Sequence, residues 1–198
     1  MARFASVGED PHLIDVFRRF PKGIAHLMHF HDEILRGPSE FSVAEREMLA
    51  AFVSALNQCG FCAGTHALVA ELFGMPEDRV RVLIETPQDA GLEPKWLPLL
   101  SYIRKLTLAP ATVTDGDARA IFAAGWSEEA LFDAVLICGL FNMSNRIVEG
   151  SGVRLTDAHL ETSRARHAAM ADSHTPYAEA GRRIGIIDAT ANLGPDHD

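Results

Sequence analysis

The stretch from Glu47 to His66 reads EMLAAFVSALNQCGFCAGTH, and it holds most of the chemistry that can be recognised in this chain of 198 residues. In its first half the large apolar residues recur every three or four positions, which is the period of a helix with one apolar face. Alanine and serine occupy the opposite face instead of lysine or glutamate, so we expect this helix to be buried on most sides. Strand signals are scarce elsewhere, and the sequence therefore predicts an all-α fold.

Start and stop signals divide the rest of the chain into further helices. Ser42 and Glu45 have the spacing of a capping box, which opens a helix expected to end near Asn57. Glycine followed by proline closes the next segment, as is usual at helix ends. The expected helices cover residues 11–35 with a break at Pro21, 42–57, 60–73, 77–85, 95–107, 115–124, 128–149 and 156–171.

The connections between these helices are short, and no linker or low-complexity stretch separates them. We therefore predict a single all-helical domain over residues 1–198, with a core at about 20–150 and a C-terminal helix and tail at 155–198. Gly150 is expected to end the helix 128–149. Residues from about Asp172 onward are expected to form a loosely packed tail.

The composition excludes several classes of protein. The hydrophobic fraction of 47% is enough for a core without disulfides or metals, and 18 Lys+Arg against 27 Asp+Glu give a formal charge of -9. That charge repels nucleic acids and anionic membranes. Because the N-terminus has no signal-peptide pattern and no apolar run approaches the roughly 18 residues of a spanning helix, we expect a cytoplasmic protein that acts on neither nucleic acid nor membrane.

Glu47 is the sole ionisable residue between positions 47 and 57, and it falls on the face of small residues. A carboxylate that faces a packed surface is costly unless it has a partner. The alternative is that Glu47 is a partly solvated first-turn residue that the helix dipole favours.

Cys59 and Cys62 form a C-x-x-C pair at the expected start of the helix 60–73, where unpaired N–H groups favour a thiolate. Their spacing also permits a disulfide. His66 follows Cys62 by four residues, so its imidazole lies on the same face and can act as a general base. The helix start favours Cys59 as the reactive thiol, but proximity to His66 leads us to favour Cys62. Glu47 is expected to orient His66 through a water molecule.

Two other roles for the cysteine pair remain open. Cys59, Cys62 and His66 could bind zinc with Glu47 or Cys138 as a fourth ligand, although zinc sites usually draw on two separated ligand pairs and no second cluster is present. Both cysteines could also be simple buried thiols. Cys138 lies in an apolar run and is expected to be an ordinary core thiol.

Two further sets of polar residues point less clearly to a site. Three closely spaced histidines cannot all lie on one helix face, and we expect surface or core residues, one of which can border the pocket. Four polar residues at helical spacing near the end of the helix 128–149 either meet solvent or line the pocket or an oligomer contact. The two sets are His26, His29 and His31, and Asn142, Asn145, Arg146 and Glu149.

The pattern of Glu47, Cys59, Cys62 and His66 resembles the active-site signature of the alkylhydroperoxidase D and carboxymuconolactone decarboxylase superfamily. The resemblance covers roughly residues 20–150, and the flanking sequences are similar to the branch called peroxidase-related proteins. These flanks are Phe30–Ser39, Glu45–Glu47, Val53–Asn57 and Leu140–Arg146.

The resemblance implies an all-helical fold, homo-oligomers that are often trimers or hexamers, a cysteine pair that cycles between dithiol and disulfide, and a glutamate and histidine that relay protons to it. One departure is Phe61, which stands where the archetype has an additional histidine. The decarboxylase branch generally lacks the cysteine pair.

The sequence thus predicts an antioxidant oxidoreductase that reduces hydroperoxides or a partner disulfide and is regenerated by an external dithiol. Its predicted catalytic residues are Cys59, Cys62, His66 and Glu47, and no metal or cofactor is expected. The alternative is a non-catalytic helical oligomer whose cysteine pair senses redox state or binds a metal.

Overall fold

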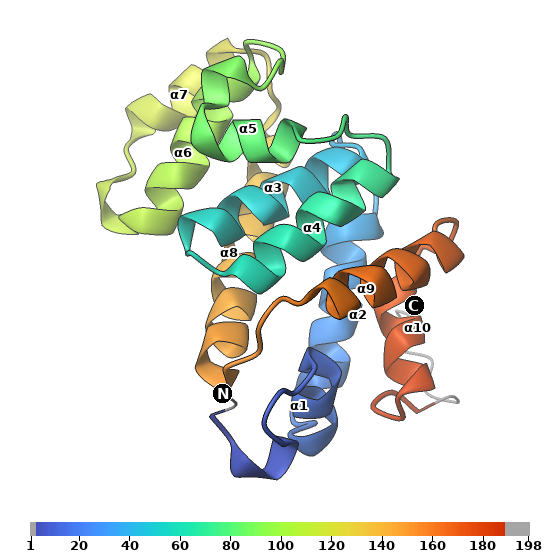
Figure 1. The fold of residues 1–198 in the computed structure, drawn as a ribbon. Helices are drawn as coiled ribbons and strands as arrows, with labels where there is room; N and C mark the ends of the chain where they lie inside the picture. Colours follow the sequence, from blue (N-terminus) through green and yellow to red (C-terminus); the bar gives the residue numbers. More distant parts are fainter. Residues whose placement is uncertain (1–2, 189–198) are drawn as a thin grey trace, which may run out of the picture.

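The computed structural model describes residues 3–188, and these residues form ten α-helices and three short 3₁₀ helices without any strand (Figure 1). The all-α prediction is confirmed. The α-helices are α1 (Leu13–Arg19), α2 (Ile24–Arg36), α3 (Val43–Leu56), α4 (Gly60–Leu72), α5 (Arg79–Glu85), α6 (Trp96–Leu108), α7 (Asp115–Ala123), α8 (Glu128–Ser151), α9 (Asp157–Ala169) and α10 (Pro176–Arg183). The 3₁₀ helices are Ala5–Val7, Pro87–Asp89 and Pro110–Thr112.

Helices α3 and α4 form the centre of the molecule, and α8 packs across α3 (Figure 1). The apolar stripe of α3 is fully enclosed: Leu49, Phe52 and Val53 are at most 1% exposed, and they share one core with residues of α8 such as Phe141. Ala50 and Ala51 on the opposite side are also inaccessible to solvent. The prediction that α3 is buried on most sides is therefore confirmed.

The predicted ends of α3 and α4 agree with the structure. The Ser42 side chain accepts a hydrogen bond from the Glu45 amide at 3.3 Å, and Glu45 accepts one from the Ser42 amide at 2.8 Å. Cys59 is the N-cap residue of α4. Between the two helices Gln58 adopts a positive φ of 58°, which reverses the chain within three residues. This short reversal brings the cysteine pair back against the end of α3.

Helix α8 is longer than expected, because it continues through Gly150 and ends at Gly152, whose φ of 81° is the left-handed conformation of a helix C-cap. The prediction that Gly150 ends this helix is wrong. By length and composition α8 could cross a membrane, but 39% of that window is buried inside the structure and buried core helices pass the same test. Its packing against α2, α3, α4 and α6 is that of a core helix.

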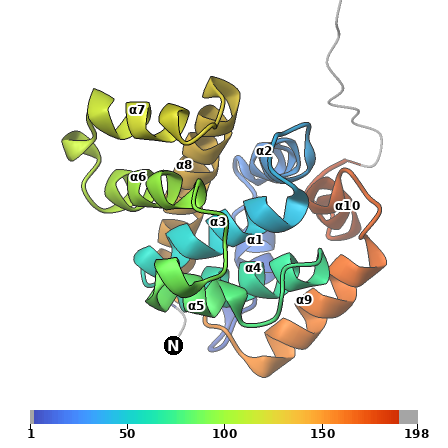
Figure 2. The same cartoon turned by 90° about the horizontal axis from the view of Figure 1, so that it is seen from above.

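The expectation of a loosely packed tail from Asp172 is wrong for the described residues, because α10 packs along α2 (Figure 2). The carboxylate of Asp32 on α2 accepts hydrogen bonds from the backbone amides of Tyr177 at 2.9 Å and Ala178 at 2.8 Å. Asp32 therefore caps the N-terminus of α10 from a different helix. The rest of the predicted tail, residues 189–198, lies outside the described residues.

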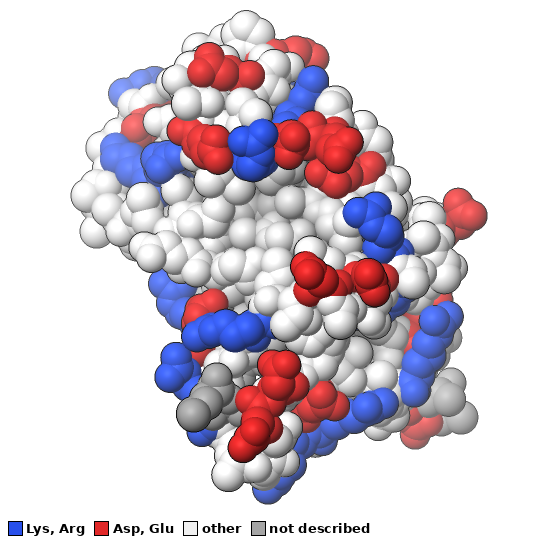
Figure 3. Space-filling view, viewed as in Figure 1, with Lys and Arg blue, Asp and Glu red and all other residues white. Residues whose placement is uncertain are grey.

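Charged side chains gather toward the two ends of the molecule in the view of Figure 3, and a band without charge crosses the region of α3 and α4. Residues 48–70 contain no lysine, arginine, aspartate or glutamate. Glu47 is consequently the one carboxylate that enters this part of the core.

We predict that Asp32→Ala will destabilise the protein by about 1–2 kcal/mol, because the first turn of α10 loses its cap. Urea unfolding followed by circular dichroism measures this change. The matched control is Glu33→Ala at the neighbouring exposed position, which should shift stability by less than about 0.5 kcal/mol. Equal effects of the two substitutions would contradict the capping role.

Candidate active site

The Glu47 carboxylate lies at the junction of three helices and has no exposure to solvent. Its Oε1 is 2.7 Å from Nη2 of Arg36 at the end of α2, and its Oε2 is 2.5 Å from Nδ1 of His66 on α4. Burial alone would raise the pKa of Glu47, but His66 and Arg36 outweigh burial and hold it at about 2. Glu47 is therefore an ionised, paired carboxylate and not a partly solvated first-turn residue.

This pairing fixes the tautomer of His66. Because an ionised carboxylate can accept but not donate, Nδ1 of His66 carries the proton that it shares with Glu47. In the neutral imidazole with this tautomer, Nε2 carries the lone pair that can accept a proton. The ring of Phe141 packs edge-on against the imidazole at 4.5 Å between centroids and limits its rotation. The contact between Glu47 and His66 is direct, so the bridging water expected from the sequence is not needed.

Cys59 and Cys62 are both free thiols and are buried, with exposures of 0% and 4%. Their side chains are hydrogen-bonded to each other, and this bond lowers the pKa of Cys59 while it raises that of Cys62. The pair therefore holds its shared proton on Cys62 and favours a thiolate at Cys59. The direction is the one that the helix-start argument expected for Cys59, but its largest cause is the interaction with the Cys62 side chain.

A network of amides supports the cysteine pair from the side of α3 and α8. Asn57 donates to Oδ1 of Asn145 at 3.0 Å, and Asn145 donates to Oγ of Ser54 at 2.9 Å. Asn145 is 2% exposed, and its hydrogen bond to Cys62 acts to lower the pKa of that thiol. Part of the predicted polar stripe on α8 therefore lies beside the cysteines and does not meet solvent.

Of the remaining members of that stripe, Asn142 and Arg146 lie further out, whereas Glu149 is close enough to the cysteine pair to raise the pKa of both thiols. Asn142 contacts Asn57 and donates to the Cys138 carbonyl at 2.9 Å. Arg146 is exposed and donates to the Asn142 carbonyl, and Glu149 forms a surface ion pair with Arg154 at 2.9 Å. The stripe thus runs from the cysteine pair outward to solvent.

A cavity of about 150 Å³ opens beside the cysteine pair. Cys62 and His66 both line it, whereas Cys59 does not. Among the described residues His66 makes no hydrogen bond to either cysteine, so a molecule in the cavity would have to connect them. The wall is mostly apolar and includes Leu13, Phe17, Leu27, Met28, Phe61, Phe141, Val148 and Ile184.

The other candidate residues are placed as follows. His31 is half-buried and borders the cavity, and desolvation lowers its pKa to about 4. His26 is exposed, and His29 lies on the same helix away from the cavity wall. Cys138 is a core thiol, as expected, and is hydrogen-bonded to Thr107 at 3.3 Å. Within residues 3–188 no group of three or more His, Cys, Asp or Glu side chains could hold a metal ion.

Sequence reasoning did not identify three parts of this site. Arg36 lies in the flank Phe30–Ser39, but nothing in the sequence gives it a role, because it is one basic residue at the end of a helix followed by Gly37 and Pro38. Asn57 was treated as a helix end only. The cavity residues of α9 and α10, among them Arg166 and Tyr177, lie more than ninety positions after the cysteines in the sequence.

Comparison with known proteins agrees with this architecture. Residues 21–103 match the carboxymuconolactone decarboxylase family. No curated protein matches the sequence significantly. The fold is similar to the crystal structure of an uncharacterized peroxidase-related protein from Silicibacter sp. TM1040, with a TM-score of 0.69, 21% identity and coverage of 75% of this chain and 78% of that one.

A second solved structure is equally similar in fold. It is an alkylhydroperoxidase AhpD core, an uncharacterized peroxidase-related protein from Ralstonia eutropha JMP134, with a TM-score of 0.69, 23% identity and the same coverage of 75% and 78%. At these identities the likeness concerns the fold. The family match covers residues 21–103, less than half of the chain, and agrees with the resemblance seen in the sequence.

We predict that Glu47→Gln will lower the stability at neutral pH by about 3–5 kcal/mol, because it leaves Arg36 buried beside a neutral group. In the folded protein the pKa of Glu47 is about 2, below the ordinary value of 4.5. Its ionisation therefore contributes stability that is complete above pH 4.5 and is lost as the pH falls toward 2. Urea unfolding measured across that range should show a shallower pH dependence in the variant. Parallel curves for variant and wild type would contradict the buried ion pair.

Proposed function

We propose that this chain, whose sequence resembles the alkylhydroperoxidase D and carboxymuconolactone decarboxylase superfamily, is a thiol-dependent peroxidase that reduces organic hydroperoxides. The observation that carries the proposal is that Cys62 and His66 line one cavity, while Glu47 fixes the proton on the far nitrogen of His66. A thiol and a base that share a cavity are the minimum that peroxide reduction requires.

In the first step Nε2 of His66 takes the proton of the Cys62 thiol, through the bound hydroperoxide or a water molecule. The Cys62 sulfur attacks the outer oxygen of the hydroperoxide, so that an S–O bond forms and the O–O bond breaks. The leaving alkoxide takes the proton back from His66 and departs as an alcohol. Cys62 is left as a sulfenic acid.

In the second step the sulfur of Cys59 attacks that of Cys62, the S–O bond breaks, and hydroxide leaves with a proton as water. Cys59 is the thiol beside Cys62 and is therefore the group placed to make this attack. An external dithiol then reduces the disulfide and becomes a disulfide itself. The sum is hydroperoxide plus dithiol giving alcohol, water and disulfide, with two electrons transferred.

Burial of the cysteines favours a small hydroperoxide over a protein disulfide as the oxidant. With exposures of 0% and 4%, neither sulfur can meet the surface of a second protein in this conformation. The regenerating dithiol must likewise be small or slender. A cysteine pair that must be reduced by a small dithiol can be regenerated in a reducing compartment. We therefore propose, as part of the same hypothesis, that the protein is cytoplasmic.

We predict that one equivalent of tert-butyl hydroperoxide will consume two of the three thiols of the reduced protein, counted with a thiol reagent. Cys62→Ser should abolish the fast reaction, and Cys59→Ser should stop it at a sulfenic acid that dimedone traps. His66→Ala should slow the oxidation by about 10²- to 10⁴-fold, because the general base is lost.

The matched control for this experiment is Cys138→Ala, which removes a buried thiol outside the site and should leave the oxidation rate unchanged. Unchanged thiol content in the wild type would overturn the proposed function. In that case one zinc per chain in elemental analysis would favour the metal-binding alternative.

We also propose that the chain forms a homo-oligomer through an exposed face of α8. Phe132 and Met143 are 60% and 43% exposed, and eleven positions separate them, so they point in the same direction from the helix. Gly139 and Gly150 are exposed on that same face and permit close approach of a second helix.

We predict that Phe132→Glu will dissociate the oligomer, since it places a charge in the centre of an apolar contact. Sedimentation velocity on the wild type and the variant measures the assembly. The matched control is Phe122→Glu, an exposed phenylalanine on α7. A wild type that sediments as a monomer would contradict the proposal.

A further inference from the structure

Arg166 on α9 lines the cavity beside the cysteine pair without a carboxylate partner. No aspartate or glutamate among residues 3–188 forms an ion pair with it, and its Nη2 donates to Nε2 of His167 at 3.0 Å. Arg166 is half-buried. The two buried arginines have close oxygen partners: Arg36 has Glu47 at 2.7 Å, and Arg46 has the Gly37 carbonyl at 2.6 Å. Glu47 attracts Arg166 only from a distance, so Arg166 brings to the cavity wall a positive charge without an ion-pair partner.

We infer that Arg166 is the binding site for the carboxylate of a small, otherwise apolar substrate. The inference rests on the proposed function in one respect: it takes the bound carboxylate to belong to the substrate. A guanidinium stays protonated in proteins and is costly to bury without an anion, so an occupant that supplies one is stabilised by ion pairing.

His167 holds the guanidinium in place. It is 4% exposed, and burial, together with the adjacent charge of Arg166, lowers its pKa to about 3. The neutral ring can therefore accept the hydrogen bond from Arg166 without repelling it. The remaining Arg166 N–H groups are left for an occupant of the cavity.

Three hydroxyl groups of the same cavity also lack partners. The side-chain oxygens of Ser144, Ser163 and Tyr177 are buried without any hydrogen bond, and all three residues line the cavity. A buried polar group without a partner is unfavourable, and native structures contain few of them. Burial raises the pKa of Tyr177, so its hydroxyl stays neutral and can donate to an anion. Oxygen atoms of a bound molecule would satisfy these groups.

The nearby Glu47 does not provide the missing anion, because its two oxygens are held by Arg36 and His66. The rest of the wall is largely apolar, and a cavity of about 150 Å³ matches one that accommodates a benzene-sized molecule. The size and apolar wall of the cavity, together with the charge of Arg166, therefore favour a small hydroperoxide with an apolar body and one carboxylate.

Binding of an unreactive probe tests the inference independently of catalysis. Isothermal titration of the reduced protein should show that benzoate binds about tenfold more tightly than benzamide, which has the same size but no charge. Arg166→Gln should remove this preference by weakening benzoate alone, and Arg166→Lys should retain part of it because the charge is kept.

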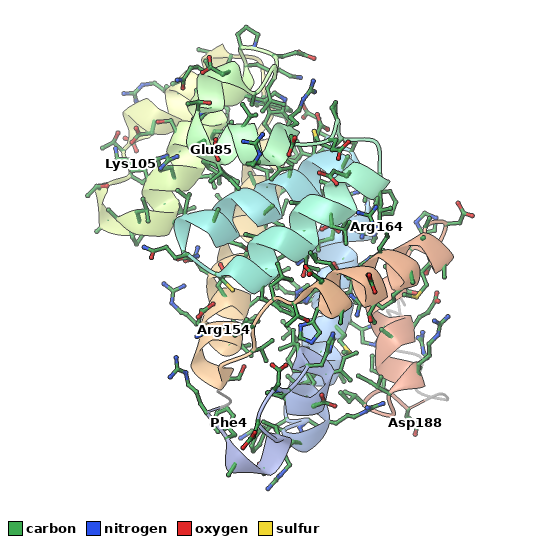
Figure 4. The ribbon with its side chains drawn as sticks, viewed as in Figure 1. Phe4, Glu85, Lys105, Arg154, Arg164 and Asp188 are labelled. Atoms are coloured by element: carbon green, nitrogen blue, oxygen red, sulfur yellow. The ribbon has the colours of Figure 1, made fainter. Side chains whose placement is uncertain are left out.

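The matched control is Arg164→Gln, which removes a charge from the exposed side of the same helix, labelled in Figure 4, and should leave the preference intact. Thermal unfolding of each variant verifies that it is folded. Equal binding of benzoate and benzamide to the wild type would overturn the inference. An undiminished preference in a folded Arg166→Gln protein would overturn it as well.

A second measurement separates this inference from the proposed function. We expect 3-hydroperoxy-3-methylbutanoate, which is tert-butyl hydroperoxide with a carboxylate on one methyl group, to oxidise the protein with a KM about tenfold lower than tert-butyl hydroperoxide. Arg166→Gln should abolish that difference in KM. Oxidation by both compounds with equal KM would refute the carboxylate site alone, whereas Arg166-dependent benzoate binding without any oxidation would refute the peroxidase alone.

Discussion

The buried carboxylate of Glu47 is the constraint on which the arrangement of this molecule depends. A single negative charge in a core segment without other charges is tolerated because Arg36 reaches it from α2 and His66 from α4. The three helices must therefore meet in one register, since a displacement of any of them would leave a charge unpaired. The same pairing fixes the proton of His66 on Nδ1 and leaves Nε2 as the acceptor. The interaction that orders the core is thus also the one that prepares the base of the proposed reaction.

The C-terminal helices complete the site around this centre. Close approaches set their position: a Cβ added to Gly64 would lie 2.5 Å from the Leu155 side chain, and one added to Gly181 would lie 2.6 Å from Met28. Asp32 caps α10 and so joins it to α2. The matched family region ends at residue 103, so the cavity wall of α9 and α10 lies outside it. In the proposed enzyme the cysteines and their base come from the family region, and Arg166 comes from the chain's own C-terminal helices.

The sequence predicted what local patterns determine. The capping box of Ser42, the helix start at Cys59 and the burial of α3 all depend on residues within a few positions of each other, and the structure agrees with them. The helix end at Gly150 was predicted wrongly, because a glycine inside a well-packed helix costs only about 1 kcal/mol and the real C-cap two residues later has the positive φ. Partners distant in sequence could not be predicted. Nothing near Glu47 identifies Arg36, and the segment after Asp172 is too polar to look like a packed helix until Asp32 and Met28 are placed beside it.

A nucleophilic cysteine needs a lowered pKa and access to its substrate, and in this structure these two properties belong to different cysteines. Cys59 has the lowered pKa but no access to the cavity, whereas Cys62 faces the cavity and has the raised pKa. Because the two thiols share a hydrogen bond, their titration belongs to the pair, and a base beside the cavity can withdraw the shared proton. A hydroperoxide in the cavity can meet Cys62 alone, so access determines the first step. Once Cys62 is a sulfenic acid, Cys59 is the thiol that remains beside it and becomes the attacking group. Separation of access and acidity between the two sulfurs thus imposes the order of the two steps in the proposed reaction.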